Sequence, residues 1–269
     1  MTTNNVFKGL ALAAALGLAL SACGSSGDDD KKGSAGSGPS LDLISSGTLT
    51  VCSDVPYPPF EDFDTSAPSG FKGFDVDVIS AVATGLDLKL KIKDSSFDAL
   101  QSGQSLNAKQ CDLVASAMTI TDDRKKALDF SDGYYDSEQS LLVPAGSDIK
   151  AIGDLDGKKV GVQQGTTGKT YAQENAKGAK IVSFPSDAEM YAAIKAGQVD
   201  ALLQDLPVNL DHTKDGKFSV VEKYSTNEQY GFAIRKGNSG LVDAVNGQLT
   251  KLHDDGKYDE IYNSYFATN

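Results

Sequence analysis

Residues 111–124 read Cys-Asp-Leu-Val-Ala-Ser-Ala-Met-Thr-Ile-Thr-Asp-Asp-Arg. The stretch begins as a short apolar strand at 113–117 and runs into a turn rich in hydroxyl groups, with Arg124 five residues after Thr119. A guanidinium can donate two parallel hydrogen bonds to a carboxylate, so a strand end with hydroxyls and one arginine suits a planar carboxylate ligand. The stretch therefore predicts a carboxylate-binding turn at the end of a buried strand.

Short apolar strands alternate with amphipathic helical segments around this turn. The predicted elements are a strand at 49–52, a helix at 75–84, a strand at 88–92, a helix at 97–105 and the strand at 113–117. This order favours a parallel sheet covered by helices. In such sheets ligands bind outside the carboxyl ends of the strands, where Asp54, Ser116 and Thr119 lie.

The same pattern restarts further along the chain. It predicts strands at 159–162, 180–184 and 200–204, and helices at 167–175 and 187–196. The segments 140–143 and 230–234 read as extended crossings between two lobes, and helices at about 240–265 return to the first. We therefore expect an α/β fold with two lobes, each a mostly parallel sheet flanked by helices. Lobe 1 is expected at 41–140 plus 235–269, and lobe 2, including the hinge segments, at 141–234. Two crossings make a hinge, and the cleft between the lobes is a natural ligand site.

Four motifs occur in an order that resembles a known family. They are Asp54-Val55-Pro56-Tyr57-Pro58-Pro59-Phe60, the turn at 111–124, Gly165-Thr166-Thr167 and Gln204-Asp205. From about Leu41 to the C-terminus the chain resembles the polar amino-acid-binding proteins of ABC importers, which are family 3 bacterial extracellular solute-binding proteins with the type II periplasmic-binding fold. The resemblance implies capture of an L-amino acid by cleft closure and delivery to an ABC permease, without a cofactor, a metal or an enzymatic step.

The resemblance also implies a role for each polar residue of these motifs. Arg124 pairs with the α-carboxylate of the ligand, and Thr166 and Thr167 donate to the same group from a helix N-terminus. Asp205 neutralises the α-amine. Further contacts to the ligand backbone are assigned to Ser116, the Ala117 backbone and Thr119. From composition alone, Arg124 reads instead as part of a solvated charged run at 122–126, and Asp205 as a carboxylate that starts a loop.

The pocket for the ligand side chain is assigned to four residues: Asp54, Tyr57, Phe97 and Gln163. Aromatic rings can hold methylene groups or a cation across their faces, although both rings could equally be core residues. Asp54 can accept hydrogen bonds from an ammonium, guanidinium or amide tip, and Gln163 adds a neutral partner. The pocket therefore favours a basic amino acid (arginine, lysine, ornithine or histidine) or glutamine, and disfavours a second carboxylate unless Lys72 reaches it.

The segment 161–170, Gly-Val-Gln-Gln-Gly-Thr-Thr-Gly-Lys-Thr, ends like a nucleotide-binding P-loop. That motif needs its first glycine where this chain has Gln163, and Gly161 lies two residues too early. We therefore interpret the turn as an anion-binding helix N-terminus of another kind.

The N-terminal segment predicts export. Lys8 precedes an apolar run at 10–20, which is the size of a signal-peptide core and too short to span a membrane. Leu20-Ser21-Ala22-Cys23 resembles a lipobox, so we expect a signal peptide at 1–22, a lipidated Cys23 and a flexible tether up to residue 40. The alternative is an ordinary secretory signal with an incidental cysteine. The expected product is a monomer anchored outside the cell membrane, with a Gram-positive surface favoured.

Composition argues against several function classes. The net charge of −12 argues against nucleic acid as a partner. His212 and His253 are far apart and lack metal spacing, which argues against a zinc site or a histidine-driven active site. Two further functions remain open. One is a receptor that passes its closed form to a sensor protein. The other is a dehydratase, because a few dehydratases resemble these binding proteins and Asp54 and Asp205 are available acids.

Two pairs of residues are given structural roles. Cys52 and Cys111 are expected on neighbouring strands, where a disulfide is geometrically demanding, and two buried free thiols are favoured. Asp75 and Asp77 invite an acid–base interpretation, but residues two apart do not share a helix face. Asp75 is therefore assigned to a helix cap or first turn.

Overall fold

The computed structural model describes residues 41–267. The predicted signal peptide, Cys23 and tether lie outside the described residues. Residues 41–267 belong to one compact unit, which contains two separate five-stranded sheets.

The first sheet and its helices form lobe 1. Its strand order is β4-β1-β5-β12-β6. The strands are β1 (Thr48–Ser53), β4 (Lys89–Asp94), β5 (Leu113–Val114), β6 (Leu128–Phe130) and β12 (Ala233–Arg235). The helices are α1 (Phe74–Gly85), α2 (Phe97–Gln101), α3 (Gln104–Asn107), α4 (Asp122–Lys125), α8 (Ser239–Asp254) and α9 (Lys257–Phe266). A short hairpin of β2 (Asp62–Phe63) and β3 (Phe71–Lys72) precedes α1.

The second sheet forms lobe 2, with strand order β11-β7-β10-β8-β9. The strands are β7 (Tyr135–Pro144), β8 (Lys159–Gln163), β9 (Lys180–Phe184), β10 (Ala201–Asp205) and β11 (Phe218–Tyr230). The helices are the 3-10 turn η1 (Ile152–Leu155), α5 (Thr167–Asn175), α6 (Asp187–Lys195) and α7 (Leu206–His212).

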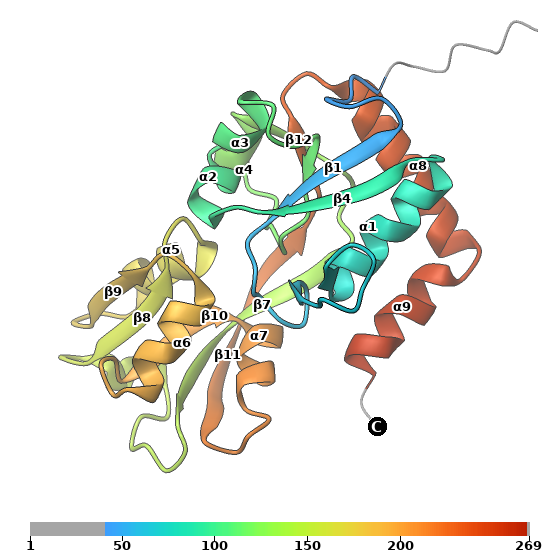
Figure 1. Ribbon diagram of the computed structural model, residues 1–269. Coiled ribbons are helices and arrows are strands. Elements are labelled where there is room, and N and C mark those ends of the chain that lie inside the picture. The colour runs from blue at the N-terminus through green and yellow to red at the C-terminus, as the bar shows by residue number, and fades with distance from the viewer. Residues whose placement is uncertain (1–40, 268–269) are drawn as a thin grey trace, which may run out of the picture. The chain divides into compact units, whose positions relative to one another are not determined.

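The predicted two-lobed α/β fold is confirmed (Figure 1). In each lobe the three strands of the repeating βα pattern are parallel, as predicted. Each sheet also contains one strand that runs opposite to these three, β12 in lobe 1 and β7 in lobe 2, and an edge strand that pairs antiparallel with it, β6 in lobe 1 and β11 in lobe 2. These added strands are the segments through which the chain passes from one lobe to the other and back.

The crossings consist of two strands that pair with each other. β7 and β11 are antiparallel from the pair Tyr135–Tyr230 to the pair Pro144–Phe218, and we call this pair the hinge ribbon. β7 begins at Tyr135, ahead of the expected boundary at 141. The largely polar residues before the apolar run 141–143 are extended as well, because they already pair with β11. β12 follows closely and pairs with lobe 1.

Two elements next to the site are shorter than their patterns predict. The helix expected at 97–105 is divided into α2 and α3 at Gly103, whose φ of 77° is incompatible with a continuous helix. The strand expected at 113–117 ends at Val114, and Ala117 has a φ of 42°. The chain therefore leaves the sheet before Ser116, which places Ser116, Ala117 and Thr119 in a turn at the strand end.

The expectation of two free thiols is wrong, because Cys52 and Cys111 form a disulfide. Cys52 lies within β1, and Cys111 lies just before β5, which pairs with β1. The Cα atoms are 5.7 Å apart, inside the range that a disulfide spans. Both residues are buried in one cluster with Phe97 and Met118. The bridge therefore ties β1 to the segment before β5, close to the turns that follow these two strands.

Both lobes bury apolar faces of their sheets. In lobe 1, α1, α8 and α9 pack together around Phe60 and Phe74, which are fully buried. In lobe 2, Leu141 and Leu203 lie in one cluster and Leu142 and Leu202 in another, so each of β7 and β10 carries buried side chains in both. Among the helices between residues 41 and 267, none is long and apolar enough to cross a membrane.

Candidate functional site

All eleven residues selected from the sequence line one cavity between the lobes. Lobe 1 contributes Asp54, Tyr57, Phe97, Ser116, Ala117, Thr119 and Arg124. Lobe 2 contributes Gln163, Thr166, Thr167 and Asp205. The space open to the centre of a water molecule is about 10 Å³, roughly what one water needs. The side chains of the two lobes are therefore in direct contact, and a larger molecule requires them to separate.

Arg124 lies on α4 and spans the cleft. Its Nη1 donates to the Thr119 carbonyl in lobe 1 (2.8 Å), and its Nη2 donates to the Gly165 carbonyl in lobe 2 (2.9 Å). The guanidinium also lies 5.2 Å from the centroid of the Phe97 ring. Burial lowers the pKa of Arg124 to about 10, so it stays charged at neutral pH. Two of its five N–H groups are used, and three remain for a carboxylate.

Arg124 does not belong to a solvated charged run. Its side chain is buried, with 6% exposure, whereas Asp122, Asp123 and Lys125 are exposed. Thr121 caps α4 by accepting from the Arg124 N–H at 3.2 Å. This single helical turn holds one cation inward while its neighbours face solvent.

The Gly165-Thr166-Thr167 turn opens helix α5. Gly165 has a φ of 79°, a conformation that glycine adopts at no steric penalty. Thr166 is the N-cap and accepts from the Lys169 N–H, while its own hydroxyl donates to the Gln163 carbonyl. The leading N–H groups of a helix lack partners within the helix, so this turn offers donors to an anion.

The same segment does not have P-loop packing. A Cβ on Gly161 would lie 2.7 Å from Leu202 Cδ2 and 3.2 Å from Met190 Cγ. Gly161 is therefore required by the packing of β8 against its neighbours, and not by the approach of phosphates.

Asp205 ends β10 and is held by three neutral donors. Its Oδ2 accepts from Tyr57 (2.9 Å) and Tyr230 (2.6 Å), and its Oδ1 accepts from Gln139 Nε2 (2.5 Å). Burial and, to a smaller extent, the charge of Glu228 raise the pKa of Asp205 to about 6, against the effect of these hydrogen bonds. A buried carboxylate with neutral partners attracts a cation.

Asp54 and Gln163 meet across the cleft. Gln163 Nε2 donates to Asp54 Oδ2 at 2.5 Å and to the Pro185 carbonyl at 3.3 Å. Burial raises the pKa of Asp54 to about 7, and the Gln163 hydrogen bond opposes the shift. In its ionised form, Asp54 places a negative charge in the same cavity as the Arg124 guanidinium.

The two aromatic residues have both packing and cavity contacts. Tyr57 is 8% exposed and contacts the core through Phe60, while its hydroxyl reaches Asp205 in the other lobe. Phe97 packs against the disulfide cluster and under the Arg124 guanidinium. Lys72 is exposed and lies 3.8 Å from Asp62, and it is absent from the residues that line the cavity.

The Ser116 hydroxyl and the Ala117 N–H already donate within lobe 1. Ser116 Oγ donates to Glu61 Oε1 (2.7 Å) and accepts from the Asp54 N–H (3.0 Å). The Ala117 N–H, expected to face a ligand, donates instead to Asp75 Oδ2 (2.8 Å). The N-cap of α1 is Gly73, so of the two structural roles expected for Asp75 the first-turn position is confirmed and the cap is not.

Sequence reasoning missed the residues that support this cavity from behind. Glu61 and Asp75 are fully buried, and burial raises the pKa of each, to about 7 for Asp75 and well above its usual range for Glu61. Glu228 accepts from Thr119 and Thr167, and Gln139 donates to Asp205. For Glu61, the signal available in the sequence was its place directly after the apolar Phe60.

The comparisons with known proteins agree with this geometry. Residues 49–268 match the family model of the bacterial extracellular solute-binding proteins, family 3. The chain belongs to this family. A probable histidine-binding protein of Neisseria gonorrhoeae is 35% identical over 98% of this chain and 97% of its own length.

Solved structures of this family are similar over most of the chain. One is an ancestral arginine-binding protein bound to glutamine, with 38% identity and a TM-score of 0.77 over 83% of this chain and 100% of that one. Another is an ancestral amino acid-binding protein described as a precursor of cyclohexadienyl dehydratase, with 38% identity and a TM-score of 0.76 over 82% and 96% of the two chains.

Proposed function

We propose that this family 3 solute-binding protein captures an L-amino acid between its lobes and delivers it to an ABC permease. The observation that carries the proposal is the placement of Arg124 and Asp205. A buried cation from lobe 1 and a buried anion from lobe 2 line one cavity, and this pattern matches the two charges of a zwitterion.

Each end of the ligand is given its own partners. Arg124 and the first turn of α5 bind the α-carboxylate, because both offer N–H donors. Asp205 binds the α-ammonium, which replaces the neutral Tyr57 hydroxyl as its partner across the cleft. Asp54 binds the tip of the side chain and releases Gln163.

The ligand class follows from the remaining charge at Asp54. Once Arg124 and Asp205 pair with the ligand backbone, Asp54 stays buried without an opposite charge. A basic side chain supplies that charge, and a glutamine amide supplies a neutral donor. The proposed ligands are therefore arginine, lysine, ornithine, histidine or glutamine. The relative named for histidine and the ancestral arginine-binding protein bound to glutamine support this set.

The cellular part of the proposal rests on residues 1–40. Removal of a signal peptide before Cys23 and lipidation of that cysteine would anchor a monomeric binding protein outside the membrane, with a Gram-positive surface favoured. Mass spectrometry of the membrane-extracted protein tests it, since the N-terminal peptide must carry acyl chains on Cys23. A sensor protein in place of a permease is the alternative partner for the closed form.

The decisive experiment uses chain 24–269, unfolded and refolded to remove bound ligand, in a thermal-shift screen with all L-amino acids. A ligand that binds only the folded state at a hundred times its Kd stabilises it by about 2.7 kcal/mol. Arg124→Ala and Asp205→Ala should each abolish the shift. Lys125→Ala, which alters the exposed neighbour of Arg124, should retain it. If no amino acid raises the melting temperature, the proposal fails.

Dehydration of a carboxylate substrate is a second candidate, favoured by two observations. The dehydratase precursor is similar over most of the chain, and Asp54 and Asp205 carry raised pKa values beside a cavity with an arginine. Such acids suit proton transfer near neutral pH. Incubation with prephenate and arogenate, followed by chromatography of the products, decides between this and binding alone.

A further inference from the structure

The hinge strand β11 carries a carboxylate that contacts both lobes. Glu228 Oε2 accepts a hydrogen bond from Thr119 Oγ1 (2.9 Å) and another from Thr167 Oγ1 (2.8 Å). Thr119 follows β5 in lobe 1, and Thr167 begins α5 in lobe 2. One oxygen atom therefore joins the two lobes beside the cavity that both threonines line. When the lobes separate, the two hydrogen bonds cannot both persist.

Glu228 is also connected to the carboxylate proposed for the α-ammonium. Gln139 Nε2, on β7, donates to Glu228 at 3.1 and 3.2 Å and to Asp205 Oδ1 at 2.5 Å. A single amide group thus lies between the two carboxylates and is oriented by both. The position of Glu228 therefore influences the donor that holds Asp205.

The local backbone directs Glu228 toward these partners. The register of β11 against β7 shifts between Tyr224 and Glu228, and Asn227 has a φ of 53°. An irregularity of this kind bends a strand and changes the direction of the following side chains. A change of Asn227 to a residue that disfavours positive φ would disturb the same feature.

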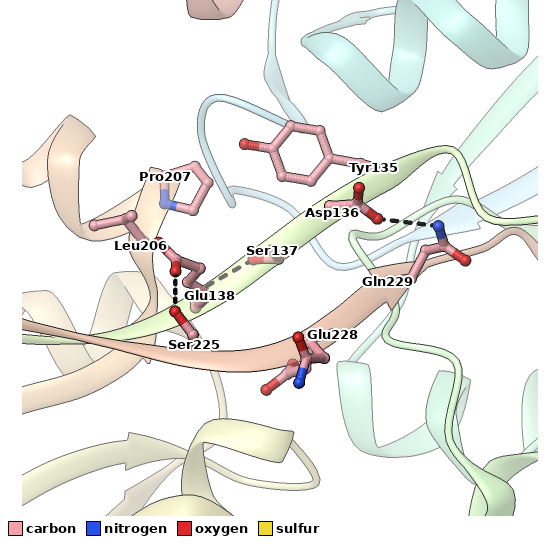
Figure 2. A pocket seen from close by; sticks show the side chains of 10 residues that line it. Tyr135, Asp136, Ser137, Glu138, Leu206, Pro207, Ser225, Glu228 and Gln229 are labelled. Atoms are coloured by element: carbon pink, nitrogen blue, oxygen red, sulfur yellow. Dashed lines mark hydrogen bonds between the residues drawn. The ribbon is translucent and has the colours of Figure 1, made fainter.

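Water can reach Glu228 from behind the hinge ribbon. The half-buried side chain lines a groove of about 660 Å³ together with Asp136 and Glu138 of β7 (Figure 2). When the threonines withdraw, water from this groove can hydrate the carboxylate. Opening therefore leaves no buried, unpaired charge, and the contact is reversible.

We propose that Glu228 is a positioning residue that latches the cleft in its closed form and orients the threonine hydroxyls. The inference rests on the proposed function of the cleft as a closing amino-acid site. Each threonine hydroxyl has one proton, and Glu228 accepts both. The hydroxyls of Thr119 and Thr167 then offer lone pairs to the cavity and suit an ammonium. The ligand carboxylate is left to Arg124 and the backbone N–H groups of α5.

The test first measures closure without a ligand, in chain 24–269. Spin labels on cysteines introduced by Lys91→Cys and Lys177→Cys, exposed positions of the two lobes, report the distance between them by pulsed electron spin resonance. Glu228→Ala should shift the distribution to longer distances. Glu138→Gln is the control, because Glu138 lines the same groove but accepts from Ser225 within the hinge ribbon and not from Thr119 or Thr167. It should leave the distances unchanged.

The second measurement is the release of radiolabelled L-arginine into an excess of unlabelled arginine. Glu228→Ala should accelerate release by about tenfold or more, because bonds to a charged group are lost, with little change in the association rate. A general loss of folding would lower the melting temperature without this split between the two rates.

Every outcome decides the proposal. Unchanged distances in Glu228→Ala, or an equal shift in Glu138→Gln, would overturn the latch. If the wild-type chain binds no arginine, the proposed ligand set is in question, while the distance measurement still tests Glu228. If Glu228→Ala fails to fold, Glu228→Gln keeps the volume and one acceptor but loses the charge. It should show a smaller shift in the same direction, and no shift would reject the latch.

Discussion

Replacement of Asp205 by asparagine should stabilise the folded protein and weaken ligand binding at the same time. Asparagine keeps the shape of the side chain, and its amide group can donate to the hydroxyls of Tyr57 and Tyr230, which are able to accept. The change removes the charge that burial opposes. It also removes the charge that an ammonium requires.

The structure gives the size and sign of both effects. The pKa of Asp205 rises from an ordinary 3.8 to about 6 in the folded state. A raised acid pKa means that the folded state holds the proton more tightly, so the wild type loses stability as pH rises from about 4 through about 6. Two pKa units correspond to about 3 kcal/mol. Asp205→Asn does not lose this stability, so above pH 7 it should melt roughly 5–10 °C higher than the wild type.

Binding should change in the opposite direction. Removal of one partner of a buried charge pair weakens binding by about 2–5 kcal/mol, or roughly 30- to 4,000-fold in Kd. Calorimetric titration at pH 7.5 measures the affinity, and thermal unfolding at pH 4 and 7.5 measures the stability. Asp200→Asn, at the exposed position directly before the same strand, is the control; the asparagine oxygen still accepts from the Lys159 N–H, so neither quantity should change. A less stable Asp205→Asn at pH 7.5 would refute the burial argument, and an unchanged affinity would refute the ammonium role.

Three further predictions concern the support of the site. Reduction of the Cys52–Cys111 disulfide, which closes a loop of 59 residues, should lower the free energy of unfolding by about 4 kcal/mol. Urea unfolding with and without reductant measures this, and two titratable thiols in the oxidised protein would contradict it. The wild type should lose stability as pH rises from about 4 through 7, because the pKa values of Glu61 and Asp75 are raised by burial. Glu61→Gln should flatten this slope in urea midpoints taken across the range, and an unchanged slope would count against it. Arg124→Lys should weaken amino-acid binding by about tenfold or more in calorimetry, because a single ammonium cannot reach the carbonyls of both lobes together. Equal affinities would show that the two-pronged guanidinium is not required.

The alternation of apolar strands and amphipathic helices was sufficient to predict both lobes. The helix at 167–175 and the strand at 180–184 agree with α5 and β9 at both ends, because Thr166 is an N-cap and the strand is short and rich in apolar residues. Of β11, only the last residue, Tyr230, lies in a segment that was predicted to be extended. Its residues are largely polar and half exposed, and its extended form depends on pairing with β7, a contact remote in sequence.

The cavity residues were predictable where they lie in short motifs. Arg124, Asp205 and the Gly165 turn each follow a recognisable strand or turn, and the structure brings them to one cavity. Glu61, Gln139 and Glu228 were missed because their roles arise from packing between distant segments. The disulfide was missed for a related reason, since Cys111 lies in the connection before β5 and not within the strand.

The small cavity has a consequence for selectivity. In the closed cleft the protein already satisfies its own binding groups, since the Tyr57 hydroxyl occupies Asp205 and the Gln163 amide occupies Asp54. These side chains compete with every solute that enters. A neutral solute would exchange one neutral hydrogen bond for another and gain little, whereas a solute with cations at both positions improves on what it displaces. Of the proposed ligands, all improve on the Tyr57 hydroxyl at Asp205 through their α-ammonium, and the basic ones also improve on the Gln163 amide at Asp54, whereas a glutamine side chain only matches that amide.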